Sequence, residues 1–474
     1  MKKLVVFLLS VSLSAVFFTV HINAQNIDEP FSTHSFGASV TSSIKALEVT
    51  ASGGSITVSG GAGSEAVVEM YVSIKNNSQN FSVLGFRRSR NRNNLSEQEI
   101  KQTIEEFYTI DIKAENGKLY AVASPKNRNK DELKISFKIR VPRQVNSLLR
   151  TNVGSIRIAD LSGSQDFRTR SGSVTIENVS GKISGNTSVG RITVTNSSEF
   201  IDLSTGSGSI AAEKCSGEIK LRTSVGAIRL NELNGEVNIT TGSGSITVEN
   251  VTGKISGSTS VGAINVTNSS EFIDLSTGSG SIAAEKCSGE IKLRTSVGAI
   301  RLNEINGEVN ITTGSGSIRV ENVTGKITGS TSVGAITVTN SENYINLSTS
   351  SGSVTASEIK GVIKTETSIG SVNLKDISGS VEAKTGSGTM TVELKSVSEY
   401  VKLSQRGNGG TTNVNLYLPA AQGYDMRINA NHNITTSELK NFSGNINNRN
   451  IQGTIANGGA AIDVNAGRVN LTFK

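Results

Sequence analysis

The 474-residue chain has no tryptophan, four prolines, three histidines and two cysteines, and aromatic residues make up only 4% of it. So few large side chains argue against a bulky globular core. None of the histidines, His21, His34 and His432, lies within the repeats that fill most of the chain, so a Ser-His-Asp site would have to be built from flanking segments. We interpret His34 and His432 as ordinary surface residues. We expect no catalytic residues, no cofactor and no metal site.

Long apolar runs and strong charge are also missing. Beyond the N-terminal segment no stretch is apolar enough to cross a bilayer, so we do not expect an integral membrane protein. The formal net charge is only +7, whereas nucleic-acid-binding domains concentrate far more basic charge, so we expect no nucleic-acid partner.

The N-terminus reads MKKLVVFLLSVSLSAVFFTVHINAQN, with two lysines, an apolar run and a small residue at Ala24. This pattern is typical of a secretory signal peptide over residues 1–24, the alternative being a membrane anchor. The sequence thus predicts export to the cell surface or the extracellular space, with the periplasm as the other destination.

An 18-residue repeat dominates the rest of the sequence. Each unit has an apolar anchor, a Gly two residues before it and a Thr five residues before it, as in Ile246, Gly244 and Thr241. The spacing never slips across fourteen anchors, which are Ile156, Val174, Ile192, Ile210, Ile228, Ile246, Ile264, Ile282, Ile300, Ile318, Ile336, Val354, Val372 and Met390. Such regularity indicates that every unit occupies the same place in a stack.

Each unit divides into two nine-residue halves, such as GSITVENVT (244–252) and GKISGSTSV (253–261). Apolar residues alternate with polar ones, which is the period of a strand, and Gly begins each half, where the chain must turn. We predict an all-β fold, a parallel β-solenoid (β-helix) with 18 residues per coil and a right-handed path. A left-handed hexapeptide helix would need an apolar residue every six positions. A calcium β-roll would need Asp where Ile246 stands.

The predicted organisation is a signal peptide (1–24), irregular N-terminal coils and a cap with an inserted short helix (25–150), regular coils (151–404), and irregular C-terminal coils with a cap (405–474). The inserted helix is expected at residues 96–108, with Ser96 as its N-cap. The motif Asn116-Gly117 predicts a hairpin over residues 109–124.

The two cysteines, Cys215 and Cys287, are 72 residues apart, which is four coils. Coils stack about 4.8 Å apart, so roughly 19 Å separates the two, and a disulfide needs Cα atoms within about 7 Å. Each stands five residues after an anchor, where sister coils have Val, Leu or Ile. We therefore expect two small buried hydrophobic residues, with intermolecular or redox use as the alternative.

Aromatic residues recur eight positions after an anchor, at Phe200, Phe272 and Tyr344, where the alternation points side chains outward or toward a corner. Such a line of rings could stack on the sugars of an extended glycan. The simpler interpretation is corner packing where the turn has changed shape, because the Gly that normally precedes this position is replaced by Glu199, Glu271 and Asn343.

Three further surface patterns have a functional and a structural interpretation. The cluster Arg87, Arg88, Arg90 and Arg92 could bind an anionic surface polymer, or form a solvated loop. The Thr column could bind ice, but we favour hydroxyl groups that close hydrogen bonds at the turns. Recurring acidic residues could form a glycosidase pair, but their outward offsets predict solvated charge pairs, such as Lys214 with Glu232 and Lys220 with Asp202.

The phrases VPRQVNSLLRTNVGSIRI (141–158) and LPAAQGYDMRINA (418–430), together with the SGSI coils, resemble a bacterial adhesin family with a β-solenoid head, related to the GIN-type adhesin head domain. The resemblance spans nearly all of the chain after the signal peptide. It implies a single-stranded β-helix and an adhesive role, and it brings no catalytic residues. We expect a non-enzymatic adhesin or surface interaction module that binds glycans or surface proteins through repeated outer faces. The alternatives are an envelope scaffold that binds a protein partner and a polysaccharide-active enzyme.

Overall fold

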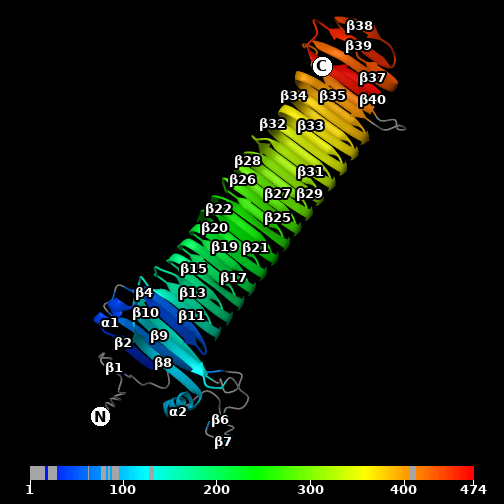
Figure 1. Ribbon diagram of the computed structural model, residues 1–474. Helices are drawn as coiled ribbons and strands as arrows, with labels where there is room; N and C mark the ends of the chain where they lie inside the picture. The colour runs from blue at the N-terminus through cyan, green and yellow to red at the C-terminus, as the bar shows by residue number, and fades with distance from the viewer. Residues whose placement is uncertain are drawn as a thin grey trace. The chain divides into compact units, whose positions relative to one another are not determined.

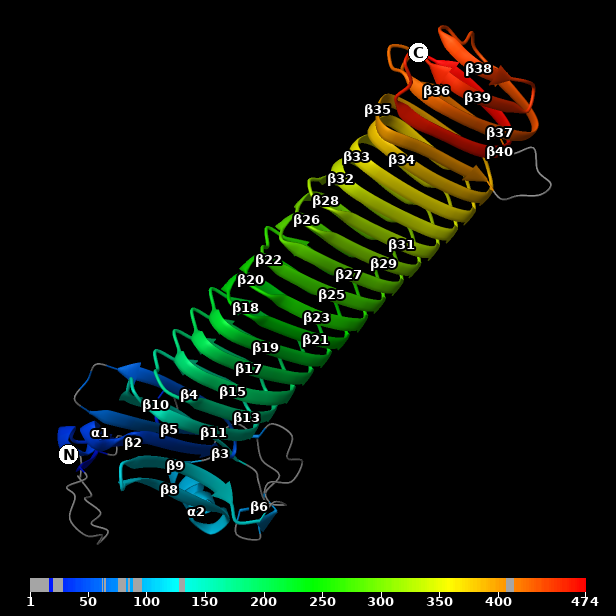
Figure 2. The same ribbon diagram turned by 45° about the horizontal axis from the view of Figure 1, so that its top comes forward.

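The computed structural model describes residues 29–61, 63, 65–75, 96–127, 133–405 and 413–474, and the backbone alone of residues 17–19, 82–83 and 86–87. It confirms the predicted fold, a parallel β-solenoid of about 14 turns with about 18 residues between equivalent positions. The chain divides into two compact units, Met1–Ile239 and Thr240–Lys474. Figures 1 and 2 show the strands of each unit stacked side by side.

The first unit contains the two helices that the structure describes and the first regular coils. Its elements are β1 (Phe17–Thr19), β2 (Ser32–Phe36), α1 (Ala38–Ser43), β3 (Ala46–Ala51), β4 (Gly53–Gly61), β5 (Ala66–Ile74), β6 (Ser82–Val83), β7 (Phe86–Arg87), α2 (Glu97–Phe107), β8 (Tyr108–Glu115), β9 (Lys118–Pro125), β10 (Leu133–Pro142), β11 (Asn146–Val153), β12 (Ile156–Ala159), β13 (Gln165–Ser171), β14 (Val174–Glu177), β15 (Ser180–Val189), β16 (Ile192–Thr195), β17 (Ser198–Ser207), β18 (Ile210–Glu213), β19 (Ser216–Val225) and β20 (Ile228–Asn234).

From β12 to β19, each regular coil of this unit has a short strand that begins at the anchor and a longer strand after a corner. The short strands pair in parallel with anchor opposite anchor, as in Ile156 with Val174 and Val174 with Ile192. The long strands pair with the same shift of 18 residues, so that Ile183 lies opposite Ile201. These aliphatic side chains are fully buried and form ladders that fill the interior.

The N-terminal end of the first unit is closed by antiparallel strands. Strand β4 pairs in parallel with β12, which places an irregular coil before Thr151, and the chain then leaves this coil and returns through β10. Strand β5 pairs antiparallel with both β10 and β2, and the predicted hairpin, β8 with β9, extends β3. Such strands protect the open edge of a parallel stack. The sequence did not predict α1, but the second helix is capped as expected, with a capping box between Ser96 and Glu99.

The second unit continues the repeat and ends in its own cap. Strand β21 (Val237–Ser243) crosses the boundary and is followed by β22 (Ile246–Thr252), β23 (Ile255–Val261), β24 (Ile264–Thr267), β25 (Phe272–Ser279), β26 (Ile282–Ser288), β27 (Glu290–Val297), β28 (Ile300–Asn306), β29 (Val309–Ser315), β30 (Ile318–Val323), β31 (Ile327–Val333), β32 (Ile336–Ser351), β33 (Val354–Ile369), β34 (Val372–Ser387), β35 (Met390–Gln405), β36 (Asn413–Leu418), β37 (Tyr424–Thr436), β38 (Phe442–Ile446), β39 (Asn450–Ile455) and β40 (Ala460–Phe473).

The C-terminal cap does not follow the order of the chain. The last strand, β40, pairs in parallel with β35 and β36 on one side and with β37 on the other. Strand β39 then pairs antiparallel with β37, and β38 antiparallel with β39. Strand β36 pairs directly with β35 and so continues the stack, but β40 lies between both of these strands and β37.

The Thr column joins consecutive coils. These threonines are buried. Thr151 donates to the carbonyl of Gly54, and most of those after it donate to the carbonyl of the Gly 15 residues earlier, as from Thr205 to Gly190 at 3.0 Å and from Thr313 to Gly298 at 2.9 Å. A Cβ at Gly298 would overlap the carbonyl oxygen of Gly280, so no larger residue fits this turn. The hydroxyl groups thus close hydrogen bonds at the turns, as the sequence predicts, and their burial leaves no threonine array for ice.

The structure shows a second column, of residues with a left-handed backbone, that was not predicted from the sequence. Four residues after each of the first thirteen anchors the backbone turns with a positive φ, and none of the residues there is the usual glycine. In the second unit they include Asn250 (φ 55°), Asn268 (φ 50°) and Lys286 (φ 53°). Asparagine adopts this conformation most readily after glycine, and the Nδ2 of Asn268 donates to the Oδ1 of Asn250 at 3.3 Å. An Asn at a fixed offset from the anchor was the signal available in the sequence.

Candidate functional site

The aromatic column is half-buried on the outer face of the long strands. In the first unit Phe200 lies opposite Lys182 of the preceding coil, and the Nζ atoms of Lys182 and Lys220 lie 5.7 and 5.2 Å from its ring centroid. In the second unit Lys292 lies 4.9 Å from the ring of Phe272 and Lys364 lies 5.8 Å from that of Tyr344. The rings are therefore engaged in cation–π contacts. A sugar that stacked on the faces these lysines cover would have to displace them.

The turn before each aromatic residue keeps a positive φ, as at the equivalent Gly217 and Gly361 of the next coils, although the angle is smaller. Glu199, Glu271 and Asn343 have φ values of 84°, 83° and 78°, close to that of Gly289 (φ 95°), which occupies the same position one coil after Glu271. The pairing runs without a shift from Gly181 through Glu199 to Gly217. The fold therefore imposes a left-handed backbone on residues that do not favour it.

Charged residues on the outer faces form ion pairs, although not all with the predicted partners. Lys220 does lie opposite Asp202, but it pairs with Glu218, and Asp202 pairs with Arg222 at 2.7 Å. Lys214 pairs with the adjacent Glu213 at 3.6 Å rather than with Glu232. The second unit repeats the diagonal pair, Arg294 with Asp274 at 2.8 Å.

The two cysteines are buried, 2% exposed, and unpaired with each other. Cys287 lies opposite Ile305 in the ladder of inward side chains, as predicted from the sister coils. Burial raises the pKa of the Cys215 and Cys287 thiols, which makes the reactive thiolate scarcer.

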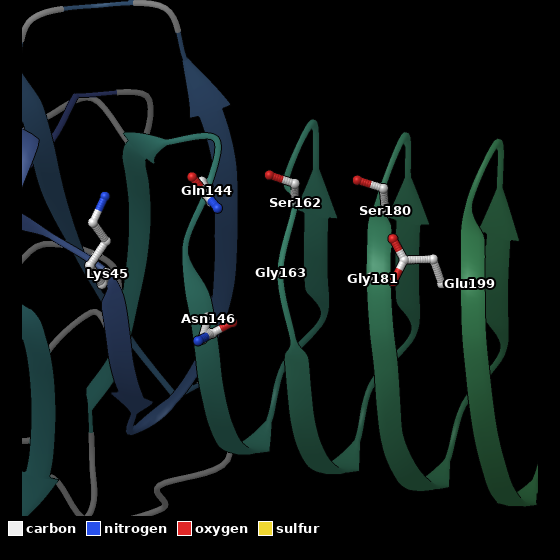
Figure 3. Close-up of a pocket in the computed structure, with 8 residues that line it drawn as sticks. All are labelled: Lys45, Gln144, Asn146, Ser162, Gly163, Ser180, Gly181 and Glu199. Atoms are coloured by element: carbon white, nitrogen blue, oxygen red, sulfur yellow. The ribbon is translucent and has the colours of Figure 1, made fainter.

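A shallow hollow of about 410 Å³ lies along the corner of the first unit, between the short and the long strands. Figure 3 shows Lys45 and Glu199 at its two ends and small Ser and Gly residues between them. Its polar groups already serve the fold, since Asn146 accepts from the backbone N–H of Ser164 at 2.8 Å and Ser162 donates to the carbonyl of Arg143. Among its lining residues, neither Ser162 nor Ser180 forms a hydrogen bond with Lys45 or Glu199.

Other candidate groups are scattered. Within the described ranges, no group of three or more His, Cys, Asp and Glu residues could hold a metal ion. His432 is exposed, whereas His34 is half-buried in β2 and burial lowers its pKa. Among the helices that the structure describes, none has the length and apolarity to cross a membrane. The segment 1–24, apart from the backbone of Phe17–Thr19, and the side chains of Arg87, Arg88, Arg90 and Arg92 lie outside the described residues.

The clearest unassigned surface feature is a column of exposed aliphatic side chains three residues before alternate anchors. Among the described residues eight large apolar side chains are exposed, and seven belong to this column. In the first unit they are Val153, Val189 and Val225, which are 50–55% exposed. In the second unit they are Val261, Val297, Val333 and Ile369, which are 54–63% exposed. We call the second group the valine edge.

The valine edge lies in turns that contain no charge. From residues 242–245 to residues 386–389, each of these four-residue turns holds only Gly, Ser, Ala, Thr, Val or Ile. The coils between the valines have Ser at the same position, for example Ser279 and Ser315, both exposed. The four side chains stand on alternate coils, roughly 10 Å apart, with a serine coil between each pair. A monomeric protein normally scatters its exposed apolar side chains, so a regular line of them is a candidate interaction surface. The signal was visible in the alternating SVGA and GSGS turns.

Comparison of the chain with family models, with curated proteins and with solved structures finds no match in any of the three.

Proposed function

We propose that this protein is an exported, non-enzymatic interaction module of the adhesin type that binds a protein surface through the valine edge. The observation that carries the proposal is the exposure of Val261, Val297, Val333 and Ile369 in turns without charge. Covering one such half-exposed aliphatic side chain contributes roughly 1 kcal/mol. Four such side chains in one column can together give measurable binding even when each contact is weak.

The chemistry of the edge favours a protein partner over a glycan. Glycans are bound through exposed aromatic faces or through polar and charged side chains that meet their hydroxyl and acidic groups, whereas the edge presents aliphatic side chains. The rings of Phe272 and Tyr344 are engaged by lysines. The proposed export depends on the segment 1–24, and the proposed absence of catalysis accords with the scattered acids and histidines.

An envelope scaffold remains the second candidate, because an apolar edge would serve a protein partner inside the envelope equally well. The two functions differ in whether the edge is reachable from outside the intact cell. That difference is directly measurable.

The binding role is tested by changing the valine edge to the serine that alternate coils already carry. The variant V261S/V297S/V333S/I369S is expected to reduce adhesion of producing cells to protein-coated surfaces by at least tenfold, with an unchanged thermal midpoint. The reciprocal variant S279V/S315V, which fills gaps in the column, should increase adhesion. A control with four outer-face changes elsewhere, T247S/T337S/T355S/T391S, should leave it unchanged. Equal adhesion by all three variants and the native chain would contradict the proposal.

A further inference from the structure

Three arginines of the first unit line one open groove. Arg150 on β11 and Arg168 and Arg170 on β13 surround a hollow of about 390 Å³, with Thr50, Asn152 and Ser188 beside them. All three arginine side chains are exposed. We call this the arginine groove; it lies on strands and turns that precede the valine edge in the sequence.

The arginines lack the partners that arginines have elsewhere in this chain. Arg150 and Arg168 lie directly opposite each other in the parallel ladder, and like charges in that position are unfavourable. In contrast, Arg157 pairs with Glu177 at 2.6 Å and Arg222 with Asp202 at 2.7 Å. With the described residues, the three groove arginines form neither ion pairs nor side-chain hydrogen bonds.

The sequence explains why the carboxylates are missing. Arg222 finds Asp202 twenty residues earlier on the preceding coil, but the residue twenty before Arg168 is Leu148. Glu48, which lies opposite Leu148, is engaged by Lys118 at 2.7 Å. The nearest acid on the same strand, Asp166, accepts from the hydroxyl of Ser184 at 3.2 Å. This hydrogen bond leaves the negative charge of Asp166 in place, so that carboxylate offsets part of the charge of the three arginines, and the groove keeps a net positive charge.

We propose that the arginine groove binds an acidic polysaccharide through its sulfate or carboxylate groups. Planar guanidinium groups form paired hydrogen bonds with such oxyanions, and arginines on adjacent coils, about 4.8 Å apart, can contact neighbouring charges of one polymer. The hydroxyl groups of Thr50 and Ser188 and the amide of Asn152 supply partners for sugar hydroxyls. The groove has no aromatic residue on which bases could stack, which favours a glycan over nucleic acid. This site is independent of the valine edge.

The test measures binding of the full chain to immobilised dextran sulfate and to polygalacturonate, with neutral dextran and double-stranded DNA as comparators. We expect both acidic polymers to bind, neutral dextran not to bind, and added salt to weaken binding. The relative affinities of dextran sulfate and polygalacturonate tell which oxyanion the groove prefers. The triple variant R150Q/R168Q/R170Q should lose at least tenfold in affinity. Its thermal midpoint should not fall, because the unfavourable pair Arg150 and Arg168 is removed.

The matched control R229Q/R301Q/R427Q removes the same charge from three exposed arginines at separate sites and should change the affinity less than twofold. Equal losses in the two variants would show general charge attraction and overturn the proposal. Absence of binding to either polysaccharide would overturn it as well. DNA binding that is tighter than both, and lost in the groove variant, would replace the acidic glycan with a polyphosphate. The valine-edge variant should bind these polymers normally, so the two proposals fail separately.

Discussion

Replacing Glu271 with Gly should stabilise the protein, although glycine usually weakens a strand. Glu271 has a φ of 83°, its side chain is exposed, and the equivalent residue of the next coil is Gly289 at φ 95°. A non-glycine residue held in such a conformation costs about 1–3 kcal/mol. Against this, glycine lowers the free energy of unfolding by about 0.5–1 kcal/mol, because the unfolded chain gains conformational freedom. The difference predicts a net gain of roughly 0.5–2 kcal/mol.

The assay is urea unfolding of the full chain, followed by circular dichroism, with amide hydrogen exchange of residues 272–279 as a local readout. The matched control is Glu249→Gly on β22, because Glu249 is also exposed but lacks a positive φ. The control should lose about 0.5–1 kcal/mol. If Glu271→Gly destabilises the chain as much as the control does, the backbone at Glu271 is not strained and the reasoning fails.

Two further predictions concern the Thr column and the N-terminal cap. Thr313→Val removes the hydrogen bond from the hydroxyl to the Gly298 carbonyl and should lower the free energy of unfolding by about 1–3 kcal/mol. Thr312→Val, on the exposed face of the same strand, should change it by less than about 0.5 kcal/mol. Equal effects of the two substitutions in urea unfolding would refute the role of the hydroxyl. Burial lowers the pKa of His34 in the folded chain, so the contribution of neutral His34 to the free energy of unfolding is present above about pH 6.5 and is lost as the pH falls below it. Part of the decrease in thermal midpoint between pH 7.5 and pH 5.5 should therefore disappear in His34→Gln. An identical decrease in that variant would contradict this prediction.

The sequence predicted what depends on local spacing. A strict 18-residue interval between apolar anchors can be satisfied only if they stack, so the ladder from Ile264 to Ile282 followed directly, as did the burial of Cys287. The Thr hydroxyl bonds followed from the position of the column beside a turn. The helix at Glu97–Phe107 followed from its capping residue.

The features that the sequence did not predict depend on which residues or strands, distant in the chain, become neighbours in the folded structure. Asp202 can reach either Lys220 or Arg222, and only the geometry of adjacent strands selects the arginine. The insertion of β40 between β36 and β37 is a long-range pairing that no local pattern encodes. The exposure of Val261 was also missed, because a valine in an alternating pattern is normally expected to face the core.

The two candidate surfaces are proposed to bind ligands of different chemical classes. The valine edge suits a protein surface, and the arginine groove suits an acidic glycan. Both lie on outward positions of the repeat, where substitution leaves the buried ladders intact. A solenoid can therefore acquire such surfaces by changing one column of side chains.

The most direct test of the central proposal, an outward-facing interaction edge, is thiol labelling of intact producing cells. The native chain supplies the background, because its only cysteines, Cys215 and Cys287, are buried and their pKa is raised. Ser279→Cys places one exposed thiol in the column of the valine edge. We predict that a membrane-impermeant maleimide labels this variant, but not the native chain, on intact cells. Labelling of Ser279→Cys only after lysis would contradict the adhesin proposal and favour the envelope scaffold.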